Sequence, residues 1–182
     1  FYYLYMEIPQ FVGDAYAKHN QTIKALVPDY SESIAVYKEY MNEAIEDEYD
    51  FEPMPADFNT GFEIITDSTS FLSVVFYNYE YTGGAHGVHY TTVANIDLTT
   101  GESKNITDYY TNLDSLKESL FNLVNEEVQN EDMGCLGFES FDDVENVFDR
   151  TVVTPDSIFI FFSDYEVCPY ATGNPPVFLP RK

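Results

Sequence analysis

The sequence predicts an α+β fold in which helices pack on a mainly antiparallel β-sheet. Strand-like and helical segments follow one another in blocks, in the order strand, two helices, several strands, two helices and strands. This order lacks the regular alternation of strands and helices that a parallel sheet requires. The chain has 182 residues, of which 45% are apolar, so it can bury a core and still form one domain.

We expect one compact domain over residues 1–182, built from two halves. The N-terminal half covers about residues 1–109 and the C-terminal half about residues 110–182. The sequence contains no internal repeat, no low-complexity segment and no linker that would separate them. The two halves should therefore meet directly, near residues 109–112.

The N-terminal half begins with a strand over residues 1–8, followed by two helices. The first helix follows Gly13, and its apolar face carries Val12, Ala15, Tyr16, Ile23 and Leu26. The second begins near Asp29 or Ser31, and its apolar stripe is formed by Ile34, Tyr37, Met41, Ala44 and Ile45. We expect it to fray after about Asp47, because carboxylates at a helix C-terminus oppose the helix dipole.

Strands are expected in the middle of the chain and near its end. Residues 62–66, 71–81 and 88–98 are rich in β-branched and aromatic side chains, and so are residues 150–154 and 157–162. We predict that residues 71–81, 88–98 and 157–162 share one largely antiparallel sheet. A proline-rich C-terminal segment follows the last of these strands.

Two further helices are expected between these strands. The first has one apolar face, formed by Leu113, Leu116, Leu120, Leu123, Val124 and Val128. Thr111 and Asp114 have the spacing of a capping box at its start. A short helix over residues 141–149 begins with the same spacing, at Ser140 and Asp143. We predict that the longer helix packs on the sheet.

Composition excludes several classes of partner. The chain has 8 basic and 32 acidic residues, a formal charge of −24 at pH 7, which would repel nucleic acids and anionic membrane surfaces. No apolar run approaches the ~20 residues of a membrane span, so we expect no membrane insertion. The sequence starts at Phe1 without a signal-like segment, so we expect a trimmed chain from which a signal peptide or anchor has been lost.

The most distinctive local feature is the glycine-rich segment around His86. Glycines in this pattern indicate positive φ angles or close backbone approach, with an imidazole held at the apex. The reading that we favour is a hairpin connection whose histidine donates to a backbone carbonyl. The alternatives are a ligand contact and a metal or catalytic site. His86 and His89 would point to opposite faces of an extended strand, so a shared metal would need a bent loop.

The remaining candidates predict structural roles. His19 lies on the apolar face of the first helix, which favours a half-buried structural histidine. Cys135 and Cys168 form no metal-binding pattern, and they can be either one disulfide or two buried thiols. Motifs of nucleotide-binding, hydrolase, zinc-protease and EF-hand sites are absent. We therefore expect a protein that is not an enzyme, without catalytic residues, bound metal or cofactor.

Four stretches of the chain resemble a known tandem of extracytoplasmic domains. They are Tyr5-Met6-Glu7-Ile8-Pro9 with the following helix, Tyr79–Gly87 running into Tyr90–Leu98, Thr100–Glu102 with Ile106–Tyr109, and Tyr165–Gly173 with Val177–Pro180. This tandem is found in RsiV-type anti-sigma factors, in the non-catalytic region of PdaC-type peptidoglycan deacetylases, and in bacterial lipoproteins. The Gly-Gly-Ala-His-Gly loop and the segment around Pro169-Tyr170 are its most specific parts.

The resemblance implies an α+β domain outside the cytoplasm, secreted or lipid-anchored, that binds or senses a ligand. In RsiV-type members it implies a receptor for lysozyme, a basic protein that a strongly acidic domain would attract. The alternative is a module that binds cell-wall glycan (peptidoglycan) and assists an envelope enzyme, with aromatic side chains as stacking platforms. We predict one ligand-binding surface that brings together Gly83, Gly84, His86, His89, Pro169 and Tyr170.

Overall fold

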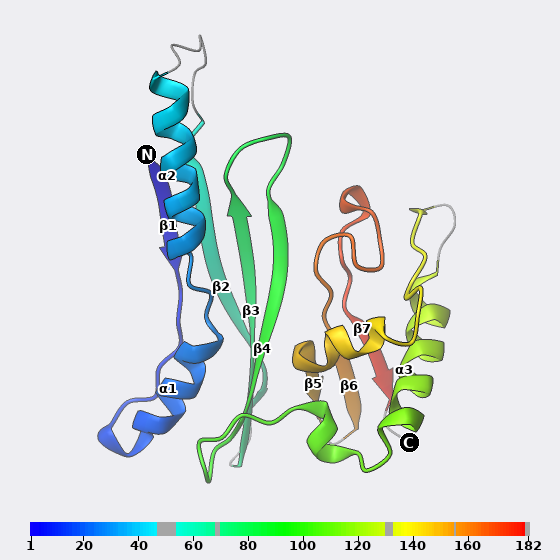
Figure 1. The fold of residues 1–182 in the computed structure, drawn as a ribbon. Coiled ribbons are helices and arrows are strands. Elements are labelled where there is room, and N and C mark those ends of the chain that lie inside the picture. Colours follow the sequence, from blue (N-terminus) through cyan, green and yellow to red (C-terminus); the bar gives the residue numbers. More distant parts are fainter. Residues whose placement is uncertain (47–53, 68–69, 130–132, 155, 181–182) are drawn as a thin grey trace.

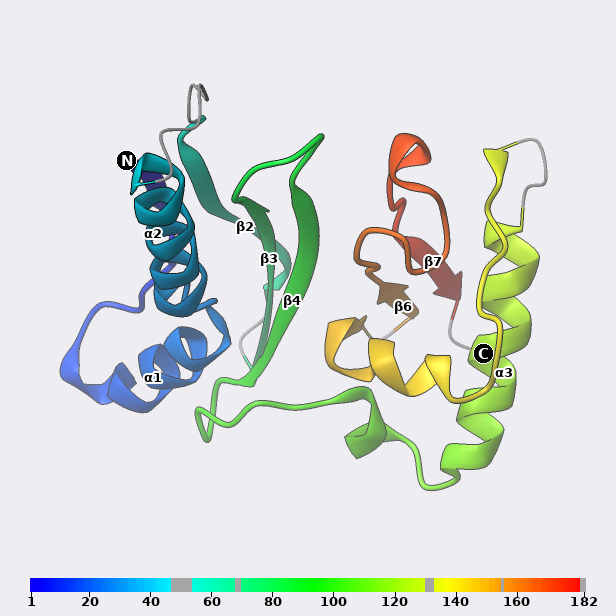
Figure 2. The ribbon, with the colours of Figure 1, turned by 45° about the horizontal axis from the view of Figure 1, so that its top comes forward.

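A computed structural model describes residues 1–46, 54–67, 70–129, 133–154 and 156–180, and it confirms the α+β class. A four-stranded and a three-stranded sheet lie side by side between helices (Figure 1). Helices α1 and α2 lie on the outer side of the first sheet, and α3 lies on the outer side of the second. The order is the same in the turned view (Figure 2).

The first sheet has the strand order β1-β2-β3-β4 and is formed by β1 (Tyr2–Met6), β2 (Ala56–Asp67), β3 (Phe71–Tyr81) and β4 (Val88–Asp97). The β2–β3 and β3–β4 pairs are antiparallel, as predicted, whereas β1 pairs with β2 in parallel. Strand β2 begins six residues before the predicted start at Phe62. Along β3, Leu72, Val74 and Phe76 face the N-terminal helices, while Val75 faces the second sheet.

Helices α1 (Ala17–Leu26) and α2 (Ser31–Glu46) cover the outer face of this sheet and form a hydrophobic core with it. Ile23 packs on the middle of β3 and β4, and Tyr30, Ile34 and Tyr37 pack on Phe58 of β2. The expected start of the first helix was wrong, since the short 3-10 helix η1 (Asp14–Tyr16) precedes α1 and leaves Val12 and Ala15 exposed. Ile45 is also exposed rather than part of the stripe. The fraying predicted after Asp47 lies outside the described residues.

The second sheet corrects the prediction of one shared sheet. Its strands, in the order β5-β6-β7, are β5 (Thr151–Val153), β6 (Ser157–Ile160) and β7 (Val177–Pro180), all antiparallel. Alternate residues of the predicted strand over 157–162 face opposite sides. Ile158 and Ile160 face α3, whereas Phe159 and Phe161 face the first sheet. The segment therefore packs against the first sheet through its side chains instead of extending it. Strand β7 lies in the proline-rich C-terminal segment, for which the sequence pattern predicts no strand.

Helix α3 (Leu113–Val128) packs on the second sheet through Leu116, Leu120, Val124 and Val128. The predicted stripe was too wide, because Leu113 and Leu123 are exposed. The cap was also misplaced: Asn112 is the N-cap, and its side chain accepts from the Ser115 N–H at 3.1 Å. The predicted helix over residues 141–149 is the 3-10 helix η4 (Asp143–Arg150).

Contacts between distant segments hold the fold together. Cys135 and Cys168 form a disulfide, which settles the alternative left open by the sequence and joins the segment after α3 to the segment before β7. Between the sheets, the amide of Asn95 donates to the Thr151 carbonyl at 2.7 Å. His19 is buried, and its Nε2 lies 3.0 Å from the Leu98 carbonyl, as a structural histidine should be.

Candidate functional site

The loop between β3 and β4 is held in a conformation that requires its glycines. Gly83 and Gly84 have φ angles of 125° and 93°, which side chains other than hydrogen rarely allow. The Tyr81 hydroxyl donates to the Gly84 carbonyl at 3.0 Å. A Cβ atom on Gly87 would lie 2.4 Å from the Tyr79 ring, so the backbone can pass here only without a side chain. These constraints fix the conformation of the loop, which faces the C-terminal half of the chain.

Both nitrogens of His86 have partners, and these partners define its tautomer. Nδ1 lies 2.8 Å from the Gly87 carbonyl, which can only accept, so Nδ1 carries the hydrogen. Nε2 then accepts from the Tyr165 hydroxyl at 2.9 Å. The imidazole also stacks on Tyr170, with ring centroids 4.0 Å apart and planes 19° apart. The backbone contact supports the reading as a loop histidine, and the stack on Tyr170 connects the loop to the C-terminal half.

Tyr165 is presented by a tight and well-braced turn. Its φ of 67° makes it the one residue other than glycine with a positive φ in the described part of the chain. Glu166 holds the turn, because its carboxylate accepts from the Ser163 N–H at 2.8 Å. The same carboxylate pairs with Arg150 through Nη1 and Nη2 of the guanidinium. Such bidentate pairs fix orientation. The result is an exposed tyrosine whose ring lies 5.9 Å from that of Tyr170.

Asp164 connects the strand β4 to the C-terminal segment. Its Oδ2 accepts from the His89 backbone N–H at 2.6 Å and lies 3.2 Å from His89 Nδ1, and its Oδ1 accepts from the Asn174 amide at 2.6 Å. The Asp164 side chain is only 3% exposed, whereas that of His89 is 55% exposed. His89 also lies near Tyr79 and Tyr170, with centroid distances of 4.8 and 5.9 Å.

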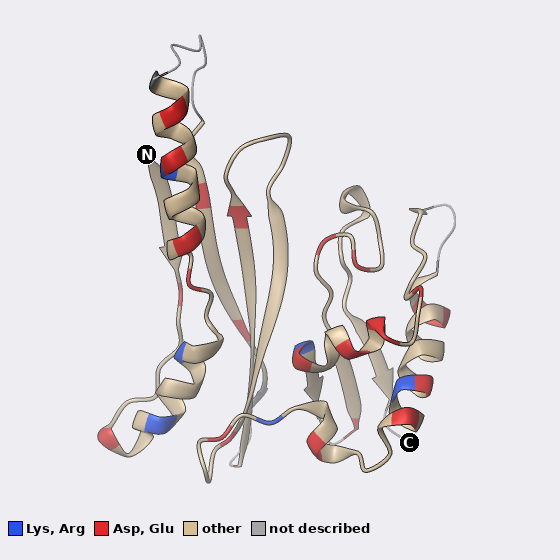
Figure 3. Cartoon of the chain, viewed as in Figure 1, with Lys and Arg blue, Asp and Glu red and all other residues tan. Residues whose placement is uncertain are grey.

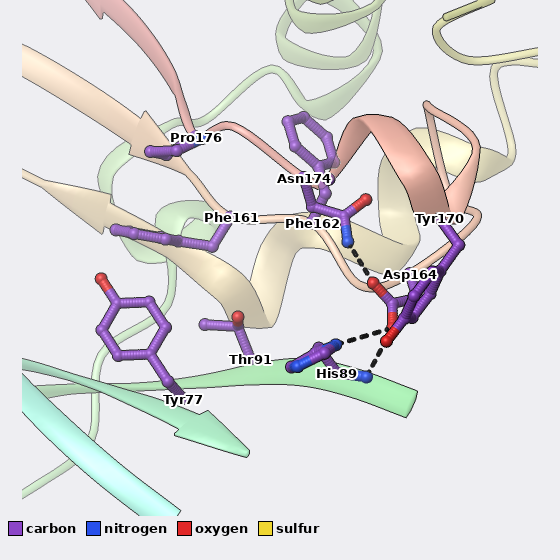
Figure 4. A pocket seen from close by; sticks show the side chains of 10 residues that line it. Tyr77, His89, Thr91, Phe161, Phe162, Asp164, Tyr170, Asn174 and Pro176 are labelled. Carbon is purple, nitrogen blue, oxygen red and sulfur yellow. Dashed lines mark hydrogen bonds and ion pairs between the residues drawn. The ribbon is translucent and has the colours of Figure 1, made fainter. Parts of the chain in front are cut away.

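A cleft of about 310 Å³ lies beside this network (Figure 4). It is lined by Tyr77, His89, Thr91, Phe161, Phe162, Asp164, Tyr170, Gly173, Asn174 and Pro176. Strands β3 and β4 supply one wall and the segment after β6 supplies the other. We call it the Asp164 cleft, and we call His86, His89, Tyr165 and Tyr170 the histidine–tyrosine cluster. Tyr170 belongs to both, so the two features form one continuous site.

The tyrosines of the first sheet near the cleft remain protonated to unusually high pH. Burial and, after it, the hydrogen bond that it donates to Glu63 together raise the pKa of Tyr77 to about 12. Burial also raises the pKa of Tyr79, with a smaller contribution from Tyr170. Neither phenol is therefore suited to act as a base at neutral pH. The Tyr77 ring is therefore a neutral aromatic wall of the cleft.

Of the residues predicted for the site, the structure brings together His86, His89 and Tyr170. The loop that contains Gly83 and Gly84 carries His86 onto Tyr170, and His89 lies near the same ring even though it is three residues further along. This happens because His86 lies in the loop and only His89 lies in β4. Pro169 is different: its ring lies close to Gly134, in the segment that follows α3.

Sequence reasoning missed Tyr165, Asp164, Asn174 and Tyr77. A signal existed only for Tyr165, which begins the C-terminal stretch that carries the family resemblance. Asp164 could not be singled out among 32 acidic residues. Asn174 and Tyr77 join the site through contacts between distant segments, and no local pattern marks them.

Charged groups are unevenly distributed over the described residues. Acidic side chains are spread over α2, α3 and η4, with few basic ones among them, while the β3–β4 loop carries no charge (Figure 3). Within these residues, no group of three or more His, Cys, Asp or Glu side chains could hold a metal ion. None of the described helices is both long and apolar enough to span a membrane.

The fold belongs to the α+β proteins with two sheets flanked by helices, and two family models match the chain on either side of residues 90–97, which lie in β4. Residues 2–89 match the family described as "Deacetylase PdaC", and residues 98–182 match the "Protein of unknown function (DUF3298)" family. The chain is thus similar to the first family over its N-terminal part and to the second over its C-terminal part. This confirms the PdaC part of the resemblance.

Two solved structures share the fold. A DUF3298 family member from Bacteroides fragilis NCTC 9343 is 21% identical with a TM-score of 0.58, covering 81% of this chain and 59% of its own. A DUF3298 family protein from Pseudomonas aeruginosa PAO1 is 14% identical with a TM-score of 0.50, covering 78% of this chain and 64% of its own. The chain therefore spans about three fifths of the length of these structures. A comparison with curated proteins gave no match.

Proposed function

We propose that the chain is an extracytoplasmic binding or sensing module that recognises a basic protein such as a lysozyme. The observation that carries this proposal is the stack of His86 on Tyr170, 4.0 Å apart, which joins the two distinctive segments of the sequence in one site. Tyr165, 58% exposed, extends this surface. Tyrosine is enriched among the residues that dominate protein interfaces. A rigid aromatic surface of this kind suits the recognition of another protein.

The charge of the chain supports a basic partner. At −24 the domain would attract a cationic protein over a distance and accelerate its association at low salt. The uncharged loop around His86 would then make the short-range contacts. This division of roles is typical of interfaces in which charge steers the encounter and a few central side chains hold the complex.

The disulfide and the family matches support a location outside the cytoplasm. Disulfides persist mainly in oxidising compartments, and Cys135–Cys168 braces the segment that carries Tyr170. RsiV-type anti-sigma factors and bacterial lipoproteins, which this chain resembles, place such domains at the cell surface. In that setting, a bound lysozyme would be the signal that the module senses.

A second candidate is a module that binds the glycan of peptidoglycan. The Asp164 cleft favours it, because aromatic rings of Tyr77 and Tyr170 occur there together with the polar side chains of Thr91 and Asn174. Sugars are bound by this combination of stacking and hydrogen bonds. We rank this function second, because a neutral sugar brings no positive charge to the nearly buried Asp164 carboxylate.

Calorimetric titration with hen lysozyme and, separately, with soluble peptidoglycan fragments tests both candidates. We expect lysozyme to bind, and we expect His86→Ala and Tyr170→Ala each to weaken binding by roughly 2 kcal/mol. Tyr40→Ala is the control, because Tyr40 is 51% exposed on α2, away from the site. Binding should also weaken at high salt. Failure of both cluster variants to change the affinity, in folded proteins, would refute the assignment of the surface.

A further inference from the structure

Asp164 is a nearly buried carboxylate without a full positive charge beside it. The carboxylate has three hydrogen-bonding contacts, with the backbone N–H and ring of His89 and with the Asn174 amide, and the Asp164 backbone N–H donates to the His89 carbonyl. Arg150, the cation nearest in sequence, is paired with Glu166 instead. Among the described residues, no Lys or Arg lines the Asp164 cleft or pairs with Asp164. A cation that enters the cleft would meet an uncompensated negative charge.

The other groups of the cleft are arranged to accept hydrogen bonds. Nδ1 of His89 faces the Asp164 carboxylate, which accepts its hydrogen, so Nε2 of the neutral ring is an acceptor. In Figure 4 this ring extends from β4 toward Thr91. Asn174 Oδ1 is a further acceptor, buried and without a hydrogen-bond partner among the described residues. A ligand of this cleft must therefore bring N–H donors and positive charge.

The aromatic walls of the cleft favour a planar hydrogen-bond donor. The rings of Tyr77 and Tyr170 both line it. A planar guanidinium stacks on aromatic rings and offers five N–H donors, whereas an ammonium is a compact and strongly hydrated charge. An anion is disfavoured by Asp164. A neutral sugar would leave the Asp164 charge uncompensated.

We propose that the Asp164 cleft receives an arginine side chain of the basic partner. This inference rests on the proposed function, because it names which group of that partner is recognised. The guanidinium lies in the cleft that the Tyr77 and Tyr170 rings line, with its charge toward Asp164 and an N–H donated to His89 Nε2. The histidine–tyrosine cluster then contacts the surface around that arginine.

The first test uses small probes and needs no knowledge of the partner. N-acetyl-arginine-methylamide is titrated into the ¹⁵N-labelled protein and followed by NMR. The matched controls are the citrulline analogue, which keeps the shape and loses the charge, and the lysine analogue. We expect shifts at His89, Thr91 and Tyr170 with the arginine probe, at least about tenfold weaker binding of the lysine probe, and no saturable shifts with citrulline. Equal binding of the arginine and citrulline probes would overturn the proposal, and so would tighter binding of the lysine probe.

The second test changes the cleft. Asp164→Asn removes the charge and should weaken the arginine probe at least about tenfold. Because Asp164 also holds the junction, Tyr77→Leu is a second variant that removes an aromatic wall at a side chain 44% exposed. Tyr77→Phe is its control, since it keeps the ring and loses only the hydroxyl bonded to Glu63. Unchanged probe affinity in a folded Tyr77→Leu or Asp164→Asn protein contradicts the proposal.

Lysozyme binding separates this inference from the proposed function. Lysozyme whose arginines are blocked with cyclohexanedione should bind at least about tenfold more weakly, while lysine-acetylated lysozyme should lose less. If native lysozyme binds and neither arginine blocking nor the cleft variants matter, the module function stands and the arginine cleft is wrong. If the arginine probe binds at the cleft and lysozyme does not, the cleft is correct and the partner is another basic protein.

Discussion

The amide nitrogen of Asn95 donates to the carbonyl oxygen of Thr151 across the junction of the two sheets, at 2.7 Å. The same side chain accepts from the Ser73 hydroxyl at 2.8 Å, and Asn95 is 3% exposed. Around it, Val75 and Val93 of the first sheet pack with Val152 and Phe161. One satisfied polar contact inside an apolar junction fixes how the sheets are placed, and this placement brings β4 to Asp164.

Replacement of Asn95 should therefore loosen the junction. Asn95→Ala leaves the buried Thr151 carbonyl and the Ser73 hydroxyl without their partner, so we expect a loss of about 1–3 kcal/mol in the free energy of unfolding. Urea denaturation measures it. Asn122→Ala on the exposed side of α3 is the control and should change stability by less than about 0.5 kcal/mol. Similar values for both variants would show that Asn95 does not hold the sheets.

Helix α3 offers a matched pair of leucines. Leu120 is 2% exposed and belongs to the core beneath the second sheet, whereas Leu123 is 40% exposed on the same helix. Leu120→Ala should cost about 2–5 kcal/mol, because it leaves a cavity. Leu123→Ala should cost clearly less. Thermal and chemical denaturation of both variants checks this difference, which would vanish if α3 did not pack through Leu120.

Gly87 should not tolerate a methyl group. In Gly87→Ala, the new Cβ would lie 2.4 Å from the Tyr79 ring and 2.7 Å from the Glu80 carbonyl, so the loop must shift. We expect a cost of about 1–3 kcal/mol and changed NMR shifts of His86 and His89. Gly61→Ala, which has open space around it, is the control. A Gly87→Ala protein with unchanged stability and unchanged histidine signals would show that the loop adapts freely.

The pKa of Tyr77 predicts a loss of stability in alkali. Its folded-state pKa of about 12 lies above the value near 10 of an exposed tyrosine. The unfolded chain therefore releases this proton first, and stability that is fully present below about pH 10 is lost as pH rises toward 12. Urea midpoints at about pH 8 and 11 should fall less in Tyr77→Phe than in the parent protein. An equal fall in both would mean that Tyr77 is not the group responsible.

Reduction of the disulfide should destabilise the C-terminal half. Cys135 and Cys168 are separated by 33 residues, and a closed loop of this length contributes about 2–4 kcal/mol. The Cys135→Ser, Cys168→Ser double variant should lower the melting temperature and broaden the NMR signals of Tyr170. Melting that is unaffected both by a reductant and by the double substitution would argue against this contribution.

The sequence by itself determined the α+β class, most elements and the glycine-dependent loop around His86. These properties depend on local patterns: residue periodicity for helices and strands, and glycine spacing for the loop. The same reasoning missed β7, because prolines at both its ends look like a terminal coil. It also placed the cap of α3 at Thr111 although Asn112 forms it.

Only the tertiary structure decided which strands share a sheet and which residues meet at the site. The alternation of residues over 157–162 shows that this segment has two apolar faces. It does not show whether the segment packs Phe159 and Phe161 on the face of another sheet or pairs with the edge of that sheet. The contacts of Asp164 with His89 and Asn174 likewise join segments that are far apart or irregular in sequence. Pairing across such distances depends on how whole layers pack together, and no local pattern of residues encodes it.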